Sequence, residues 1–195
     1  MKLLPEECID LTVTSPPYDN LRDYNNEVTW NFEKFQEVAK ELFRITKPGG
    51  VVVWVVGDAT INGSETGTSF RQALYFKEIG FNLHDTMIYA KNNPMPIQHN
   101  RYQPCFEYMF VFSKGKPKNF NKLTEPCKNA GKKTGGPHRD VDGKMKHKTG
   151  AGKPIKDTKI KGNIWFYDVG IYKTTKDKYA YKHPAMFPEQ LAEDH

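Results

Sequence analysis

The residues best suited to chemistry form the run Thr14-Ser15-Pro16-Pro17-Tyr18. This run combines side-chain hydroxyls with an aromatic ring, and its two prolines stiffen the backbone that carries them. It directly follows a short β-rich segment, Cys8 to Val13. Ligands of α/β sheets collect beyond the carboxyl ends of the strands, so we predict a functional site here. A stiff turn or a polyproline ligand is the alternative, although such a ligand belongs in an exposed tail rather than after a buried strand.

Other residue types indicate no second chemical centre. The three cysteines, Cys8, Cys105 and Cys127, form no C-x-x-C pair, so neither a disulfide framework nor an ordinary zinc site is predicted. Cys127 with His138 and His147 is a conceivable metal set, but its spacing does not match a zinc finger. We therefore predict no metal.

Alternating strands and helices must position the run. After it, Asn31 can cap a helix that ends at Lys47-Pro48-Gly49-Gly50. The apolar residues of this helix recur at helical spacing: Phe32, Phe35, Val38, Ala39 and Leu42. Val51 to Val56 is continuously apolar and β-branched, as expected of a strand buried on both faces of a parallel sheet.

The residues up to Phe112 continue the alternation. A polar loop, Asn62 to Thr68, precedes a helix from about Ser69 that Gly80 closes. Its apolar residues are Phe70, Ala73, Leu74 and Ile79. Two further strands are predicted at Asn82 to Tyr89 and Phe106 to Phe112. The pattern predicts a doubly wound α/β sheet.

The net charge of +6 over 195 residues hints at an anionic partner. Most of the excess lies between Lys114 and Lys161, where lysines outnumber acidic residues several-fold and apolar residues are few. Such a segment buries too little surface to order itself, which predicts a mobile basic insertion, or else a merely solvated charged loop. The longest apolar run, Val51 to Val56, is far shorter than the ~18 residues of a membrane span, and no leader precedes it, so we expect a soluble intracellular protein.

Three motifs carry a resemblance to a known family. Thr14 to Tyr18, preceded by Ile9-Asp10-Leu11 and followed by Asp19-Asn20-Leu21-Arg22-Asp23-Tyr24, resembles the catalytic motif of DNA amino-methyltransferases that modify cytosine N4 or adenine N6. Lys47-Pro48-Gly49-Gly50 before an apolar strand is similar to the next landmark of that family. Lys182-His183-Pro184-Ala185-Met186-Phe187-Pro188-Glu189 resembles the stretch that introduces the cofactor half in circularly permuted (beta-type) members. A Rossmann-like, S-adenosylmethionine-dependent methyltransferase sheet is therefore implied.

The resemblance implies direct transfer of a methyl group from S-adenosylmethionine to the exocyclic amine of a base that has left the duplex. That amine is a poor nucleophile because its lone pair is delocalised into the ring, so hydrogen-bond acceptors must orient it. In the family the acceptors correspond to Ser15 Oγ and the Pro16 carbonyl, with Pro17 stiffening the turn. Tyr18 corresponds to the ring that stacks on the base, and a phenylalanine there would keep that stacking face.

The target base and the DNA contacts are also implied by the family. Members with Ser before Pro-Pro-Tyr are mostly cytosine N4 enzymes and those with Asp or Asn mostly adenine N6 enzymes, so Ser15 favours cytosine, with adenine second. The basic insertion becomes a target-recognition region that binds double-stranded DNA, its lysines neutralising phosphates. Asp142 is one of a few side chains available for base edges. The predicted contacts are Lys132, Lys133, His138, Arg139, Lys144 and Lys146.

The cofactor half departs from the family pattern. Cofactor contacts are implied for Thr14, Ser15, His183, Pro184 and Phe187. Permuted members next carry a strand and a Gly-rich turn of the Asp-Pro-Phe-x-Gly-x-Gly kind, then an acidic residue for the ribose, and this chain has neither. It stops shortly after Pro188 begins a helix. We expect a sheet with one unpaired flank, weak cofactor binding, and completion by a complementing polypeptide.

Three explanations of this departure remain open, namely a piece of a longer or cleaved enzyme, which we favour, one subunit of a split enzyme, or a remnant that binds DNA without catalysis. A nonenzymatic nucleic-acid-binding module is the alternative of a different class. The expected organisation is a catalytic core over 1–113, a basic target-recognition insertion over 114–162, and a return to the core with the start of the cofactor half over 163–195. The expected location is the cytoplasm of a prokaryote, with phage origin also possible.

Overall fold

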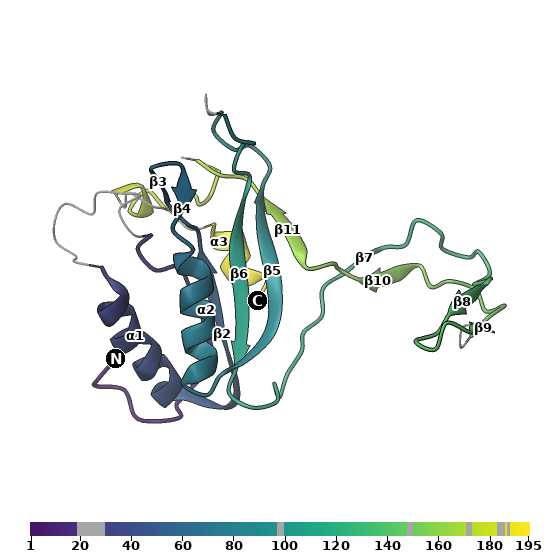
Figure 1. Ribbon diagram of the computed structural model, residues 1–195, viewed down its shortest axis with the longest axis horizontal. Helices are drawn as coiled ribbons and strands as arrows, with labels where there is room; N and C mark the ends of the chain where they lie inside the picture. The colour runs from purple at the N-terminus through teal and green to yellow at the C-terminus, as the bar shows by residue number, and fades with distance from the viewer. Residues whose placement is uncertain (19–29, 97–99, 148–149, 171–172, 183–185, 187) are drawn as a thin grey trace. The chain divides into compact units, whose positions relative to one another are not determined.

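The computed structural model describes residues 1–18, 30–96, 100–147, 150–170, 173–182, 186 and 188–195. The chain divides into two compact units, one formed by Met1–Phe120 with Asn163–His195 and the other by Asn121–Gly162. The larger unit contains the main sheet and its helices, and the smaller unit contains short strand pairs (Figure 1).

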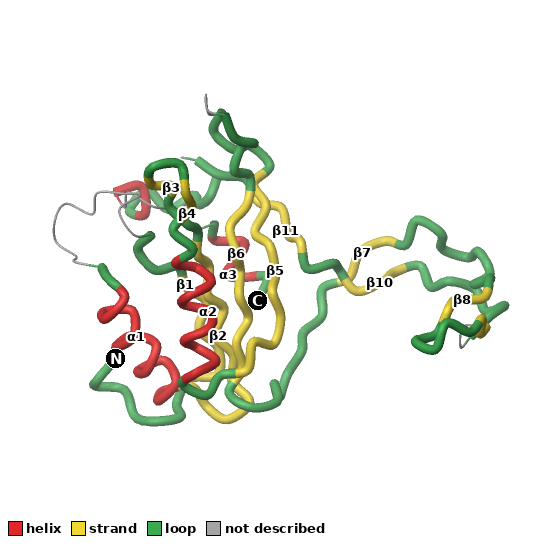
Figure 2. The backbone as a smooth tube through the Cα atoms, in the orientation of Figure 1, coloured by secondary structure: helices red, strands yellow, loops and turns green. Residues whose placement is uncertain are grey.

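A five-stranded sheet in the order β1-β2-β6-β5-β11 forms the larger unit (Figure 2). Its strands are β1 (Ile9–Thr14), β2 (Thr46–Val56), β6 (Phe106–Ser113), β5 (Asn82–Lys91) and β11 (Ile164–Tyr167). β1 is parallel to β2 and β5 to β11, whereas β6 is antiparallel to both of its neighbours.

The predicted α/β fold is confirmed, but the expectation that Val51 to Val56 lies within a parallel sheet was wrong on one side. β2 pairs in parallel with β1 and antiparallel with β6. The sheet is mixed because β6 follows β5 without a crossover helix, so the chain returns along the neighbouring position in the opposite direction.

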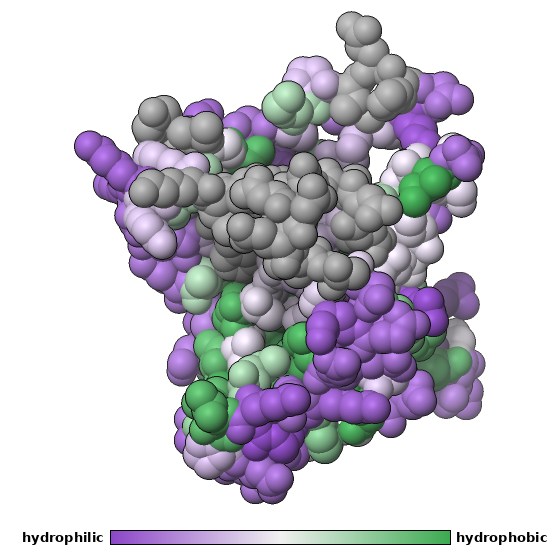
Figure 3. Space-filling view, turned by 90° about the vertical axis from the view of Figure 1, so that its left-hand side faces the viewer, coloured by the Kyte–Doolittle hydropathy of each residue, from purple (hydrophilic) through white to green (hydrophobic). Residues whose placement is uncertain are grey.

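Two helices cover one face of the sheet, α1 (Phe32–Ile45) and α2 (Thr68–Glu78) (Figure 1). α1 begins at the predicted cap, where the Asn31 side chain accepts a hydrogen bond of 2.8 Å from the backbone N–H of Lys34. Phe35 and Phe76 from the two helices pack on Trp54 of the sheet, with ring centroids 5.1–5.8 Å apart. The side of the molecule that lies on the left in Figure 1 has hydrophilic side chains with smaller apolar patches between them (Figure 3).

The buried face of α2 agrees only in part with the predicted apolar residues. Of these, Ala73 is buried, whereas Phe70 and Leu74 are 49% and 66% exposed. Phe76 is also buried, and the buried Trp54 donates a 2.8 Å hydrogen bond from Nε1 to Gln72 Oε1. Sequence periodicity favoured the more apolar stripe, whereas the tertiary packing selected the stripe that satisfies the indole N–H.

The segment Lys47 to Gly50 does not separate α1 from the strand as predicted, because α1 ends at Ile45 and the segment lies inside β2. Its extra length is absorbed where the β1–β2 register shifts between Ile9 and Leu11. Both glycines are required here. Gly49 has φ +83°, and a Cβ on Gly50 would lie 2.9 Å from a Thr46 methyl group.

A short helix, α3 (Glu189–Glu193), packs on the opposite face of the sheet, and a 3-10 turn, η1 (Ala180–Lys182), precedes it. The helix expected to begin at Pro188 begins one residue later, with Pro188 at its cap position. Leu191 is fully buried, and His195 lies 3.3 Å from Met109 Sδ and stacks on Trp165. Within the described part of the chain, no helix is both long enough and apolar enough to span a membrane.

The predicted polar loop after β2 contains a small hairpin, β3 (Thr60–Ile61) and β4 (Ser64–Glu65). Its turn residues Asn62 and Gly63 both have positive φ, at 49° and 80°. An Asn-Gly pair in this conformation is the preferred two-residue hairpin turn, because its twist matches that of the strands.

The smaller unit has more regular structure than the sequence predicted. β7 (Thr124–Pro126) pairs with β10 (Thr158–Ile160), and β8 (Pro137–Arg139) pairs with β9 (Met145–His147). None of its described residues is buried. Backbone hydrogen bonding therefore organises this unit without an apolar core. The sequence prediction considered buried apolar surface alone and did not include this contribution.

Candidate active site

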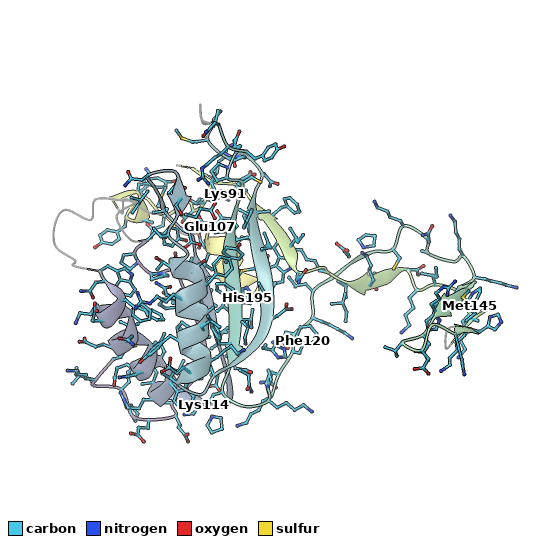
Figure 4. The ribbon with its side chains drawn as sticks, in the orientation of Figure 1. Lys91, Glu107, Lys114, Phe120, Met145 and His195 are labelled. Carbon is cyan, nitrogen blue, oxygen red and sulfur yellow. The ribbon has the colours of Figure 1, made fainter. Side chains whose placement is uncertain are left out.

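The carboxyl ends of β1, β2 and β5 lie at the same end of the sheet as the beginning of β6. This follows from the pairing, because the first three strands run in the same direction and β6 runs in the other. The predicted run after Thr14 therefore comes to the same end of the sheet as Gly57, Lys91 and Glu107. It is the upper end of the sheet in Figure 4, where Lys91 and Glu107 are labelled.

A hydrogen-bonded pair links the two ends of the predicted run. Ser15 Oγ lies 2.9 Å from the Tyr18 hydroxyl, which in turn lies 2.5 Å from Glu107 Oε2. Pro16 between them is buried. The turn is thus held both by its prolines and by a side-chain bond across it, which fixes where Ser15 points.

Glu107 is also paired with a lysine. Its second carboxylate oxygen lies 2.7 Å from Lys91 Nζ, and both side chains are largely shielded from solvent. Sequence reasoning missed both residues, because they lie on β5 and β6, far from the motif along the chain; Glu107 is 89 residues from Tyr18. A charged residue in the middle of the aromatic run Phe106-Glu107-Tyr108 was the one signal that could have indicated Glu107.

Electrostatics keep Tyr18 protonated. Burial of its hydroxyl end raises the pKa of Tyr18 well above its ordinary value, and the neighbouring Glu107 carboxylate raises it further. The residue as a whole is only partly buried. Tyr18 can therefore donate through its oxygen while part of the residue remains accessible.

Two residues that follow β2, Gly57 and Asp58, also lie at this end of the sheet. Gly57 lies beside the site, since a Cβ built on it would be 3.5 Å from the Tyr18 ring and 3.6 Å from Glu107 Cγ. Asp58 accepts hydrogen bonds from the backbone N–H and the hydroxyl of Ser69, so its carboxylate satisfies the first turn of α2. The start of α2 is thereby anchored to the loop that lines the site.

The implied cofactor residues are only partly within the described chain. Thr14 is half-buried and pairs with Trp54 of β2, and Ser15 follows it directly. The remaining three, His183, Pro184 and Phe187, lie outside the described residues. β1 stands at the end of the strand order, and Leu11 on it is 42% exposed.

The implied DNA contacts all belong to the smaller unit and are exposed. Four of them, His138, Arg139, Lys144 and Lys146, form the β8–β9 hairpin and its turn. His138 and Lys146 are directly opposite across the two strands, so they share a face that Arg139 does not. Lys146 is paired with Asp140.

The cysteines are all free. Among the residues that the structure describes, no group of three or more His, Cys, Asp and Glu side chains could hold a metal ion. Cys127, His138 and His147 do not form such a group.

The chain belongs to the DNA methylase family N6_N4_Mtase, whose model matches residues 9–195. It is 56% identical over 192 residues to the orphan methyltransferase M.BamHII of Bacillus amyloliquefaciens, a match that covers 96% of this chain and 70% of M.BamHII. It is 24% identical to the type II methyltransferase M.BglII of Bacillus subtilis, covering 97% of this chain and 51% of M.BglII.

A solved structure has the same fold. The PvuII DNA methyltransferase (cytosine-N4-specific) superimposes with a TM-score of 0.62 at 19% identity, covering 99% of this chain and 64% of that one. The sheet is therefore that of a Rossmann-like methyltransferase, as expected. The chain spans about two thirds of the length of M.BamHII and of the PvuII enzyme, and about half of M.BglII.

Proposed function

We propose that this chain carries the target-base half of a DNA amino-methyltransferase, which transfers a methyl group from S-adenosylmethionine to the exocyclic amine of a flipped base. The observation that supports this most is the constrained turn at the carboxyl end of β1, where Ser15 is bonded to Tyr18 and Tyr18 to Glu107. A fixed hydroxyl, a rigid carbonyl at Pro16 and the ring of the only partly buried Tyr18 suit an amine attached to a flat base.

Each residue of the turn then has a role. Ser15 Oγ and the Pro16 carbonyl accept hydrogen bonds from the amine, which turns its nitrogen toward the methyl donor. Pro17 keeps the turn stiff, and the ring of Tyr18 stacks on the base. Ser15 before Pro-Pro-Tyr favours cytosine N4 as the acceptor, with adenine N6 second. The reaction is a direct displacement at the methyl carbon: the N–C bond forms as the S–C bond of the sulfonium breaks, a neutral thioether leaves, and the methylated nitrogen releases one proton to solvent. No covalent intermediate with the protein forms.

We propose that the smaller unit is the target-recognition region. Its exposed cations lie on short paired strands, which present them outward at fixed spacing. Lys132, Lys133 and Lys144 suit phosphate contacts, whereas His138, Arg139 and Lys146 on the hairpin strands also suit base edges. Double-stranded DNA is the corresponding partner, and the proposed location is the cytoplasm of a prokaryote, whether the protein is encoded by the host or by a phage.

The methyl-donor site needs more than the described residues supply. Thr14 and Ser15 form one wall, and His183, Pro184 and Phe187 are proposed for another. We propose that a segment with a Gly-rich turn, in the same polypeptide or in a second one, pairs along the open edge of β1. Among the strands that the structure describes, none pairs with the outer side of β1, and Leu11 on β1 is half-exposed; both support this, because an unpaired strand edge leaves backbone groups available.

The test measures transfer of labelled methyl groups from S-adenosylmethionine to DNA, followed by mass spectrometry of the nucleosides. We expect N4-methylcytosine, and a loss of roughly 100-fold in rate for Ser15→Ala, the scale seen when one preorganised hydrogen-bonding group is removed. Ser113→Ala is the matched control, because Ser113 lies at the far end of β6.

The possible outcomes are distinct. If the product is N6-methyladenine, the acceptor base is adenine rather than cytosine, and the proposed methyltransferase activity stands. Label that appears only after a polypeptide with the Gly-rich turn is added would establish the completing segment. DNA binding without label under every condition would replace this proposal by a noncatalytic DNA-binding module.

A further inference from the structure

The direction of each hydrogen bond in the site can be deduced from the groups involved. A carboxylate only accepts, a phenol has one proton to donate, and a serine hydroxyl also has one. Glu107 receives Lys91 on one oxygen and Tyr18 on the other, at 2.7 Å and 2.5 Å. The single proton of Tyr18 is therefore directed to Glu107, since no other arrangement lets both groups bond.

The hydrogen bond between Tyr18 and Ser15 also has a fixed direction. Because Tyr18 has committed its proton, its oxygen can only accept at its 2.9 Å contact with Ser15. Ser15 must then donate its own proton to Tyr18. The raised pKa of Tyr18, caused by burial and by Glu107, keeps this phenol protonated throughout the neutral range. Nothing is left on Ser15 Oγ except lone pairs.

We propose that Glu107 and Lys91 are positioning residues that make Ser15 Oγ an obligate acceptor, so that the site selects a base with an exocyclic amine over one with a carbonyl at the same position. This rests on the proposed function and deepens it. An amine presents N–H groups to the lone pairs of Ser15, whereas a carbonyl presents lone pairs to lone pairs. No proton moves in this arrangement, because Ser15 and Tyr18 keep theirs.

The expected selectivity follows from the cost of an unmatched polar group. A carbonyl oxygen held against Ser15 and the Pro16 carbonyl would find no donor there, which corresponds to roughly a 10- to 100-fold loss of affinity. Lys91 fixes the orientation of the side chain at position 107, because its ammonium only donates and therefore bonds to an acceptor there.

Glu107→Gln should reverse the chain of bonds. Lys91 would attract the amide oxygen, which leaves the amide NH2 facing Tyr18. Tyr18 would then accept from the amide and donate to Ser15, and the Ser15 proton would turn toward the base. Tyr18→Phe should have a weaker effect in the same direction, because it frees the Ser15 proton without aiming it.

The experiment compares two duplexes that carry a methylation site mapped beforehand by sequencing DNA treated with the wild-type protein. One has cytosine at the target and the other uracil; for an adenine target the second base is hypoxanthine. The quantity measured is the ratio of the two dissociation constants. A mismatched base leaves the duplex more easily than a paired one. This difference is the same for every protein variant, so it cancels when the ratios of the variants are compared.

We expect wild type to favour the amine, Tyr18→Phe to reduce the ratio by about 10-fold, and Glu107→Gln to reduce it further. The matched control is Tyr167→Phe, which removes a 2.7 Å bond from another tyrosine hydroxyl to a carboxylate, that of Asp194. It should leave the ratio unchanged. Circular dichroism of each variant establishes that it is folded.

Unchanged ratios in both Tyr18→Phe and Glu107→Gln would overturn this inference, while methylation of the mapped site would leave the proposed function standing. If the wild-type protein methylates no site at all, even after a polypeptide with the Gly-rich turn has been added, the proposed function fails and this inference fails with it. The two failures are therefore distinguished by the mapping step.

Discussion

The bond between Trp54 and Gln72 gives the sharpest test of how α2 is fastened to the sheet. Both side chains are 1% exposed, and Nε1 of the indole lies 2.8 Å from the amide oxygen. Gln72→Met keeps the length and approximate volume of the side chain but removes the acceptor. Water cannot replace it at this depth, so the indole N–H loses its partner outright.

The expected cost is about 1–3 kcal/mol, the penalty for leaving a buried donor unsatisfied. For a unit of this size that corresponds to a fall of roughly 2–12 °C in melting temperature. Urea unfolding at unchanged m-value measures the free energy directly. Gln103→Met is the matched control, because Gln103 is exposed and its amide bonds to the loop carbonyls of Pro94 and Met95, and it should change stability by less than about 0.5 kcal/mol.

A double-mutant cycle separates the bond from the packing around it. Trp54→Phe removes the donor and also leaves a cavity, so its own cost is larger. In the double variant neither partner is left unsatisfied, so the sum of the single costs should exceed the double cost by about 1 kcal/mol or more. Additive costs, or a Gln72→Met variant as stable as wild type, would refute the claim that this bond selects the buried face of α2.

Two further predictions concern acid stability and salt. Burial against Trp165 and Met109 lowers the pKa of His195 to about 4, so its neutral form is favoured in the folded state, and stability should fall as the pH drops from 6.5 to 4. The full shift corresponds to about 3 kcal/mol, which solvent screening of this half-buried ring lowers to roughly 1–2 kcal/mol, and urea unfolding of His195→Phe across this range should lack that loss. Replacing Lys132, Lys133, Lys144 and Lys146 together by Gln should flatten the slope of log affinity for DNA against log salt by about 3–4, provided each lysine neutralises one phosphate; an unchanged slope would exclude these lysines from the DNA interface.

The candidate site at Thr14 to Tyr18 could be predicted from the sequence because its residues are contiguous. The run Thr14 to Tyr18 combined hydroxyl, proline and aromatic side chains immediately after a β-rich segment, and strand β1 does end at Thr14. The helix cap at Asn31 was predicted for the same reason, since the cap and the N–H that it binds are three residues apart. Local hydrogen bonding and backbone stiffness act over a few residues, so a pattern of a few residues is enough to predict them.

The tertiary structure alone decided which distant groups meet this run. Glu107 and Lys91 join Ser15 and Tyr18 only because β6 runs antiparallel between β2 and β5, and nothing in the local sequence specifies that direction. These contacts give Tyr18 a second role. The family resemblance implied only a ring that stacks on the base, whereas in the structure the Tyr18 hydroxyl also bonds to Ser15 and Glu107. The same holds for α2, where periodicity favoured Phe70 and Leu74 but a buried indole required Gln72. A one-dimensional pattern records which side chains are apolar, whereas the partner of each polar group is determined by the pairing of strands far apart in the chain.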